Sequence, residues 1–234
     1  MSLLGQAHKP ILIIAVAAAV TALLPTTVGA APASIPHVAP VQSSPHGATY
    51  AQWSARWWQW AFSTPATPEG PFGEGAVDCG QQQPNRKVWF LTGPHNTSGM
   101  VERTCTIPPG TALFFPLLNV ECSDQEPASF FGATAAERHV CVQQNLFQIA
   151  NLSATVDGQP VEDLGSHIVI SPDFAFVAAE GNPTGVTMSG NSTSRGAFLM
   201  LNPLPRGEHT ISFSGTFPEF PFTATTTYHI TVEQ

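Results

Sequence analysis

The stretch Phe222-Thr-Ala-Thr-Thr-Thr-Tyr-His-Ile-Thr-Val232 alternates between two sets of residues along its whole length. One set is largely apolar and consists of Phe222, Ala224, Thr226, Tyr228, Ile230 and Val232. The other set is polar and is mostly threonine. Because side chains alternate between the two faces of a β-strand, this pattern predicts a strand with one packed face and one face lined by threonines.

The segment from Glu208 to Phe217 precedes this strand and is predicted to pair with it as a hairpin. One register places His209 opposite His229, as a metal site would need. A register shifted by one residue matches Ile211 and Phe213 with Thr226 and Tyr228, and puts the two histidines on opposite faces. Hydrophobic matching favours the shifted register and speaks against a metal pair. Three other histidines are too far apart in the sequence to judge: His95, His139 and His167.

Short runs with strand character occur along most of the remaining chain. We expect strands at 88–92, 112–119, 152–156, 159–161, 167–171, 174–177 and 197–201. Pro116 indicates that the second of these bulges or lies at a sheet edge, and Asp157-Gly158 indicates a tight turn. The pattern predicts a mainly β single domain, an antiparallel β-sandwich or jelly-roll with about two helices on its N-terminal side.

Four of the five tryptophans lie in the first predicted helix, Tyr50-Ala-Gln-Trp-Ser-Ala-Arg-Trp-Trp-Gln-Trp-Ala-Phe62. Thr49 and Gln52 have the spacing of a capping box at its start. Most of the aromatic residues share one arc of the helix, which favours a helix packed against a sheet. The alternative is that Trp58 or Trp60 lines a cleft for a sugar or another apolar ligand.

A second capping box, Thr134 with Glu137, predicts a second helix from about Ala135 to Ala150. Its inner face would carry Val142, Leu146, Ile149 and Ala150. Cys141 would lie on this helix and tie it to the loop around Cys122.

The N-terminal residues predict the cellular compartment. Residues 1–30 have the polar start, apolar run and small-residue end of a signal peptide. Residues 31–47, rich in alanine and proline, are expected to be a disordered leader, and residues 48–234 the folded domain. We therefore expect a secreted protein, extracellular or periplasmic. Its sequons at Asn96, Asn151 and Asn191 would be glycosylated only in a eukaryotic secretory route.

The four cysteines favour disulfides over a zinc site in such a compartment. Three pairings are open. We expect the sequential one, Cys79 with Cys105 and Cys122 with Cys141, which would close two local loops.

The chain is acidic, with a formal net charge of −8. Nucleic acids and anionic membrane surfaces are recognised by clustered basic groups, so neither is an expected partner. The oligomeric state stays open.

One acidic cluster offers candidates for chemistry. Glu121, Asp124 and Glu126 flank Cys122, where their oxygens would suit calcium. Glu121 and Asp124 beside an aromatic cleft could also provide acid/base catalysis on a glycoside. A solvated acidic loop is the alternative. No other cofactor is expected, because nucleophile-elbow, zinc-helix, phosphate-loop and EF-hand motifs are missing from the sequence.

Several motifs together resemble a family of uncharacterised secreted bacterial proteins. They are the tryptophan cluster from Trp53 to Trp60, Val88-Trp-Phe-Leu, Arg103-Thr-Cys-Thr-Ile-Pro, the run from Ala112 to Cys122, Val156-Asp-Gly, and Leu204-Pro-Arg-Gly-Glu-His-Thr-Ile. The resemblance covers residues 50 to 232. It implies a tryptophan-rich N-terminal helix, four cysteines and a C-terminal β-sandwich, but no substrate, cofactor or catalytic residue.

We favour a binding or structural role outside the cytoplasm, because strands and aromatic residues are abundant and catalytic motifs are missing. An extracellular hydrolase or lyase that acts on a polysaccharide through carboxylates near Glu121 is the alternative. A metal-dependent redox protein is a third class. The favoured role makes a carbohydrate one candidate ligand.

Overall fold

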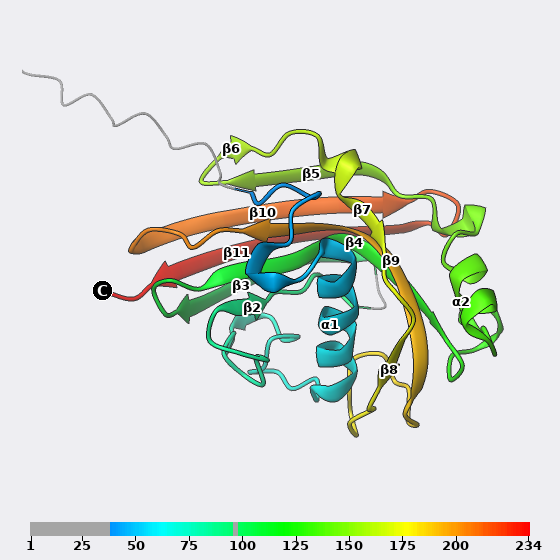
Figure 1. The fold of residues 1–234 in the computed structure, drawn as a ribbon. Helices are drawn as coiled ribbons and strands as arrows, with labels where there is room; N and C mark the ends of the chain where they lie inside the picture. Colours follow the sequence, from blue (N-terminus) through cyan, green and yellow to red (C-terminus); the bar gives the residue numbers. More distant parts are fainter. Residues whose placement is uncertain (1–37, 96–97) are drawn as a thin grey trace, which may run out of the picture. The chain divides into compact units, whose positions relative to one another are not determined.

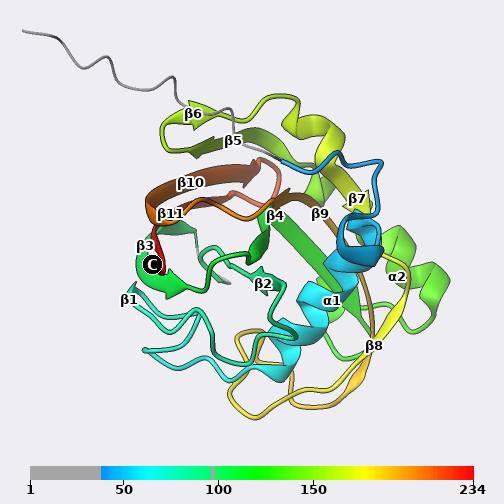
Figure 2. The same ribbon diagram turned by 60° about the vertical axis from the view of Figure 1, so that its left-hand side comes forward.

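The computed structural model describes residues 38–95 and 98–234. The predicted signal peptide, residues 1–30, lies outside this part of the chain. In the described part, two β-sheets stack face to face, and helix α1 (Tyr50–Ser63) packs on the outer face of one of them (Figures 1 and 2). The prediction of a mainly β domain with two added α-helices is confirmed.

The larger sheet has the strand order β1-β3-β11-β10-β5-β6. Its strands are β1 (Gly75–Ala76), β3 (Gly99–Ile107), β5 (Ala150–Val156), β6 (Gln159–Pro160), β10 (Gly207–Phe217) and β11 (Phe222–Val232). The smaller sheet has the order β2-β4-β9-β7, and β8 also pairs with β9. Its strands are β2 (Val88–Phe90), β4 (Ala112–Ser123), β7 (Ile168–Ile170), β8 (Phe174–Phe176) and β9 (Gly190–Leu201).

Both sheets are mixed rather than purely antiparallel. β3 is parallel to β1 and to β11, and β2 is parallel to β4. β3 was not predicted, although its inward positions alternate as Val101, Arg103, Cys105 and Ile107. The buried arginine interrupts the apolar pattern, so the segment does not look like a packed strand in the sequence.

The hairpin of β10 and β11 has the predicted register. Ile211 is opposite Tyr228 and Phe213 is opposite Thr226. His209 and His229 therefore lie on opposite faces, and each meets a carboxylate instead of the other histidine. The turn at Asp157-Gly158 also forms, with both residues at positive φ.

Helix α1 begins at the predicted capping box of Thr49 and Gln52. All four of its tryptophans are buried, against a cluster that includes Phe90, Phe114 and Phe198 of the smaller sheet. The opposite face of that sheet contributes Leu113, Phe115 and Leu199 to the core between the sheets. A helix with such a broad apolar arc is stable only when packed in this way.

The predicted bulge at Pro116 is present in β4. The pairing of β4 with β9 shifts between Pro116 and Leu118. Before the shift, odd-numbered residues such as Phe115 face the core between the sheets. After it, the buried residues Leu118 and Val120 belong to a separate cluster beside helix α2 (Ala135–Cys141). The bulge therefore changes which side chains of β4 face each layer.

Helix α2 is much shorter than the predicted span of 135–150. It ends at Cys141, and a single 3-10 turn, Asn145–Phe147, follows. The polar run Gln143-Gln144-Asn145 offers no apolar residue to continue the inner face. Val142 and Phe147 are both buried beyond the helix end, so the inward packing is made by a turn rather than by a longer helix.

Residues 38–47, the described part of the expected disordered leader, are packed on the domain. Val38 forms a β-bridge with Leu201, and the carbonyl of buried Ala39 accepts a hydrogen bond from the Tyr50 hydroxyl (2.5 Å). The backbone N–H of Ala39 also donates to Met200 (2.9 Å). These contacts are long-range, which explains why local composition did not reveal them.

Two disulfides join Cys79 to Cys105 and Cys122 to Cys141, the expected sequential pairing. Disulfides are typical of oxidising compartments. Within the described residues, no helix is both long enough and apolar enough to cross a membrane.

Candidate functional site

A cavity of about 350 Å³ lies along the second half of β4, from Pro116 to Glu121. Its position follows from where β2 ends. β2 pairs with β4 only up to Phe114, and the chain then leaves the sheet at Gly93-Pro94. Beyond that point, the described strands pair with β4 only on its β9 side. The cavity thus occupies the place that a longer β2 would fill.

Aromatic side chains make up much of the cavity wall. They come from helix α1, the turns after β4 and α2, and the ends of β10 and β11: Trp57, Trp58, Phe130, Phe147, Phe217, Phe220 and Phe222. Phe220 is partly exposed, whereas Phe147 and Phe217 are buried. Small-molecule sites are commonly concave and mostly apolar in this way, with a few polar groups that orient the ligand.

The two predicted tryptophan candidates differ in their positions. Trp58 lines the cavity, and its indole N–H is buried without an acceptor among the described residues. Trp60 has a similarly unpaired indole N–H but does not line the cavity; it stacks on Phe72 and contacts Phe90. The structure therefore places Trp58 at the candidate site and Trp60 in the core.

Glu121 lies on β4 at the polar corner of the cavity, where it is 5% exposed. It accepts a hydrogen bond from the Ser192 hydroxyl of β9. Burial raises the pKa of Glu121 well above its usual range, and the negative charge of the nearby Glu126 carboxylate adds to this. Burial also raises the pKa of Glu126, which lines the same cavity. The pair can therefore hold a proton between its carboxyl groups.

Asp124 is not part of this corner. Its carboxylate accepts hydrogen bonds from the backbone and side chain of Asn191 and lies 3.8 Å from Arg138. Burial favours a higher pKa for Asp124, but the hydrogen bonds from Asn191 outweigh it and the pKa is lowered. Of the two catalytic candidates named from the sequence, Glu121 therefore lines the cavity, together with Glu126, and Asp124 does not.

The calcium hypothesis for Glu121, Asp124 and Glu126 is not supported by the geometry. Throughout the described ranges, no group of three or more histidine, cysteine, aspartate or glutamate residues is placed to hold a metal ion. A solvated acidic loop is also the wrong description of Glu121, which is buried within a strand.

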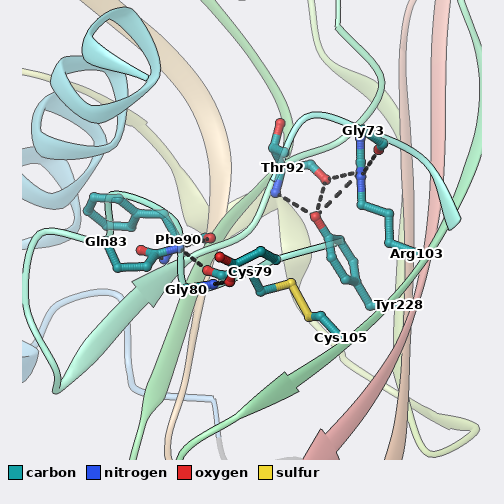
Figure 3. Close-up of a disulfide and its surroundings, with 10 residues drawn as sticks. Gly73, Cys79, Gly80, Gln83, Phe90, Thr92, Arg103, Cys105 and Tyr228 are labelled. Carbon is teal, nitrogen blue, oxygen red and sulfur yellow. Dashed lines mark hydrogen bonds between the residues drawn. A yellow bond between two sulfur atoms is a disulfide. The ribbon is translucent and has the colours of Figure 1, made fainter. Parts of the chain in front are cut away.

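The wall formed by residues 92–95 is held by a buried arginine (Figure 3). The Arg103 guanidinium donates to the backbone carbonyls of Thr92 (2.7 Å), Gly93 (3.3 Å) and Gly73 (2.6 Å). The Tyr228 hydroxyl also donates to the Thr92 carbonyl (3.0 Å). Cys105, two residues along β3 from Arg103, is tied to Cys79. These contacts fix the segment that replaces β2 beside the cavity.

His95, at the end of this segment, lines the cavity. Burial, together with the positive charge of Arg103, lowers the pKa of His95 to about 4. Its imidazole is therefore neutral at pH 7. No lysine or arginine is among the described residues that line the cavity.

The opposite wall is braced by α2. Cys141 of this helix is bonded to Cys122, next to Glu121, and Arg138 binds Asp173 through two hydrogen bonds (2.7 and 3.0 Å). Arg138 also approaches Asp124, two residues before Glu126. The disulfide and the ion pairs therefore set the position of the loop that carries Glu126.

Several site residues were missed from the sequence. Phe217, Phe220 and Phe222 meet at the β10–β11 turn, and Phe130 and Phe147 lie far from them in the chain. Glu126 was considered only as a calcium ligand. One local feature of the sequence could have revealed them. A dense set of phenylalanines around a hairpin turn is unusual for a solvated loop.

Comparison with known proteins gives no family. No protein-family model matches the chain, and no curated protein matches it. The chain is similar at 12% identity to a chain of the structure described as PbICP-C in complex with falcipain-2, with a TM-score of 0.27, covering 63% of this chain and 99% of that one. Amebosin aligns at 12% identity with a TM-score of 0.20, covering 68% and 98%. TM-scores this low do not establish a shared fold.

Proposed function

We propose that this chain is a secreted protein, extracellular or periplasmic, that binds a small ligand in the cavity beside β4. One observation carries the proposal: an aromatic cavity of about 350 Å³ whose few polar groups, including the Glu121–Glu126 pair, could orient a ligand. Known small-molecule sites combine these features. The two disulfides and the predicted signal peptide support secretion.

A cavity-filling variant tests the binding role. Ala224 lines the cavity from β11 and is 6% exposed, so Ala224→Phe places a ring inside it. Ala175, on the exposed side of β8 and outside the cavity lining, allows the matched control Ala175→Phe. A small-molecule library is screened by ligand-observed NMR against wild-type protein and both variants. We expect hits whose binding is lost only in Ala224→Phe. If no compound binds, or if hits bind all three proteins equally, the proposal is wrong.

Hydrolysis of a polysaccharide is a second candidate, because burial raises the pKa of Glu121 beside a second carboxyl group, as in a general acid. The spacing argues against it. Glu121 and Glu126 are close enough for each to affect the pKa of the other, whereas glycoside hydrolysis needs carboxyl groups about 5–9.5 Å apart. Product formed by wild-type protein and lost in Glu121→Gln would favour the enzyme; binding without product favours the binding role.

A further inference from the structure

We infer that the ligand of this cavity is a neutral sugar of about monosaccharide size, bound by its hydroxyl groups to Trp58, Asn119 and the Glu121–Glu126 pair. This inference rests on the proposed function and specifies the ligand. It is carried by the unpaired donors, the carboxyl acceptors, the aromatic wall and the cavity's size.

Two buried donors in the cavity wall have no acceptor among the described residues: the indole N–H of Trp58 and the side-chain amide N–H of Asn119. Trp58 is only 6% exposed, and its indole nitrogen is buried. A buried donor without a partner destabilises the protein, because the hydrogen bonds that it made to water are not replaced. A ligand oxygen that accepts from these groups would remove that cost.

The same cavity offers acceptors. Glu121 and Glu126 place their carboxyl oxygens at the polar corner of the cavity. Within the described chain, β4 also has a strand neighbour only on its β9 side from Pro116 to Glu121. A ligand must therefore both accept and donate hydrogen bonds within a small volume. A hydroxyl group does both with one atom, and sugars carry several hydroxyl groups on one rigid ring.

The apolar part of the cavity wall suits the C–H face of a sugar ring. The C–H groups of a pyranose form apolar patches that pack on aromatic rings, and phenylalanines such as Phe130 and Phe222 supply such rings. The volume of about 350 Å³ lies near the lower end of the range of known small-molecule sites, about 300–1,000 Å³. The cavity therefore suits a small ligand of about one sugar ring.

Charge selects against two related ligand classes. No lysine or arginine of the described chain lines the cavity and His95 is neutral, so a sugar phosphate or uronate would meet two carboxyl groups and no cation to balance its charge. An amine could pair with Glu126, but it has no lone pair when protonated and would leave the Trp58 and Asn119 donors unpaired. The observations favour a neutral sugar over an amine.

Matched tryptophan variants test the inference. Trp58→Phe and Trp60→Phe each remove one unpaired indole N–H from the core, but only Trp58 lines the cavity. Titrations followed by ligand-observed NMR use a panel of neutral hexoses and disaccharides, with hexose phosphates, amino sugars and phenethylamine as competitors. Thermal melts confirm that each variant is folded.

We expect at least one neutral hexose or disaccharide to bind saturably, and its charged analogues to bind at least about tenfold more weakly. Trp58→Phe should weaken the sugar by about tenfold, the worth of one hydrogen bond, while Trp60→Phe binds as wild type. Equal binding to both variants, or preferred binding of phosphates or amines, overturns the sugar inference. If an amine binds and Ala224→Phe abolishes it, the binding role stands without the sugar; if no probe of any class binds, both proposals fail.

Discussion

The two halves of β4 show how one strand can make both a core and a site. From Ala112 to Phe114 the strand lies between β2 and β9, and its side chains are fully buried. From Pro116 to Glu121 it has β9 on one side and the cavity on the other. Both halves are rich in apolar residues. The neighbouring strand, rather than the sequence of β4 itself, decides whether a segment is packed or left open.

The largest expected effect compares the same substitution in the two halves. Leu113 packs between the sheets and is 0% exposed, whereas Leu118 is 3% exposed and borders the cavity. Large-to-small changes in cores cost about 2–5 kcal/mol, and less where few atoms surround the lost group. We expect Leu113→Ala to lose about 4 kcal/mol and Leu118→Ala about 2 kcal/mol in urea unfolding. Equal losses would show that the two halves are packed alike.

The disulfides provide the next comparison. Each closes a loop of similar length, with sequence separations of 26 and 19, so replacing either pair by serines should cost about 3 kcal/mol. Ligand affinity should respond differently. Loss of Cys122–Cys141 loosens the loop of Glu126 and should weaken binding more than loss of Cys79–Cys105. Melting curves and ligand titrations on the two double variants check this, and the reverse order of affinities would contradict the bracing role of α2.

The two carboxylates near Cys122 should give opposite pH dependence. The pKa of Glu121 is raised by folding, so its favourable contribution is complete below its unfolded pKa and is lost as pH rises through the folded value. The pKa of Asp124 is lowered, so its contribution is present above its unfolded pKa and is lost as pH falls. Relative to wild type, Glu121→Gln should therefore gain stability as pH rises, and Asp124→Asn should lose it.

Urea unfolding between pH 3 and pH 9 measures both differences. The two curves of stability difference against pH should have opposite slopes. Parallel curves would mean that Glu121 does not hold its proton at the cavity.

The last comparison concerns the cavity wall formed by residues 92–95. Folding lowers the pKa of His95 from 6.5 to about 4, so the wild type should lose stability as pH falls from about 6.5 through 4. His95→Gln should remove this part of the acid slope. His139→Gln, at an exposed position of α2, serves as the control and should keep it. A wild-type slope that persists in His95→Gln would show that His95 is not buried against the cavity.

Features that depend on neighbouring residues were predicted from the sequence. The capping box at Thr49, the bulge at Pro116 and the register of Ile211 with Tyr228 all follow from short patterns, and the structure confirms them. The short disulfide loops were also expected, and Cys79 pairs with Cys105. In each case a local rule of backbone geometry or hydrophobic matching is sufficient.

Features that depend on distant segments were not predicted. β3 was not predicted because Arg103 occupies an inward position of the strand. Its guanidinium donates hydrogen bonds to backbone carbonyls of loops that are distant in the sequence. The cavity was not predicted because it forms only where β2 ends beside β4. Its walls come from helix α1 and the β10–β11 turn, which are distant from β4 in the sequence. Trp58 and Glu121 were named as candidates, but their meeting at one cavity is a property of the fold.

The most direct test follows the indole N–H signals in a two-dimensional ¹⁵N–¹H NMR spectrum during titration with the neutral sugar that binds best. The N–H of Trp57 donates to Leu91 and that of Trp53 to Pro45, while those of Trp58 and Trp60 are unpaired within the described chain. We predict that the Trp58 signal shifts saturably while the Trp60 signal stays in place. A stationary Trp58 signal at saturating sugar, or a shift centred on Trp60, would contradict binding in the cavity beside β4.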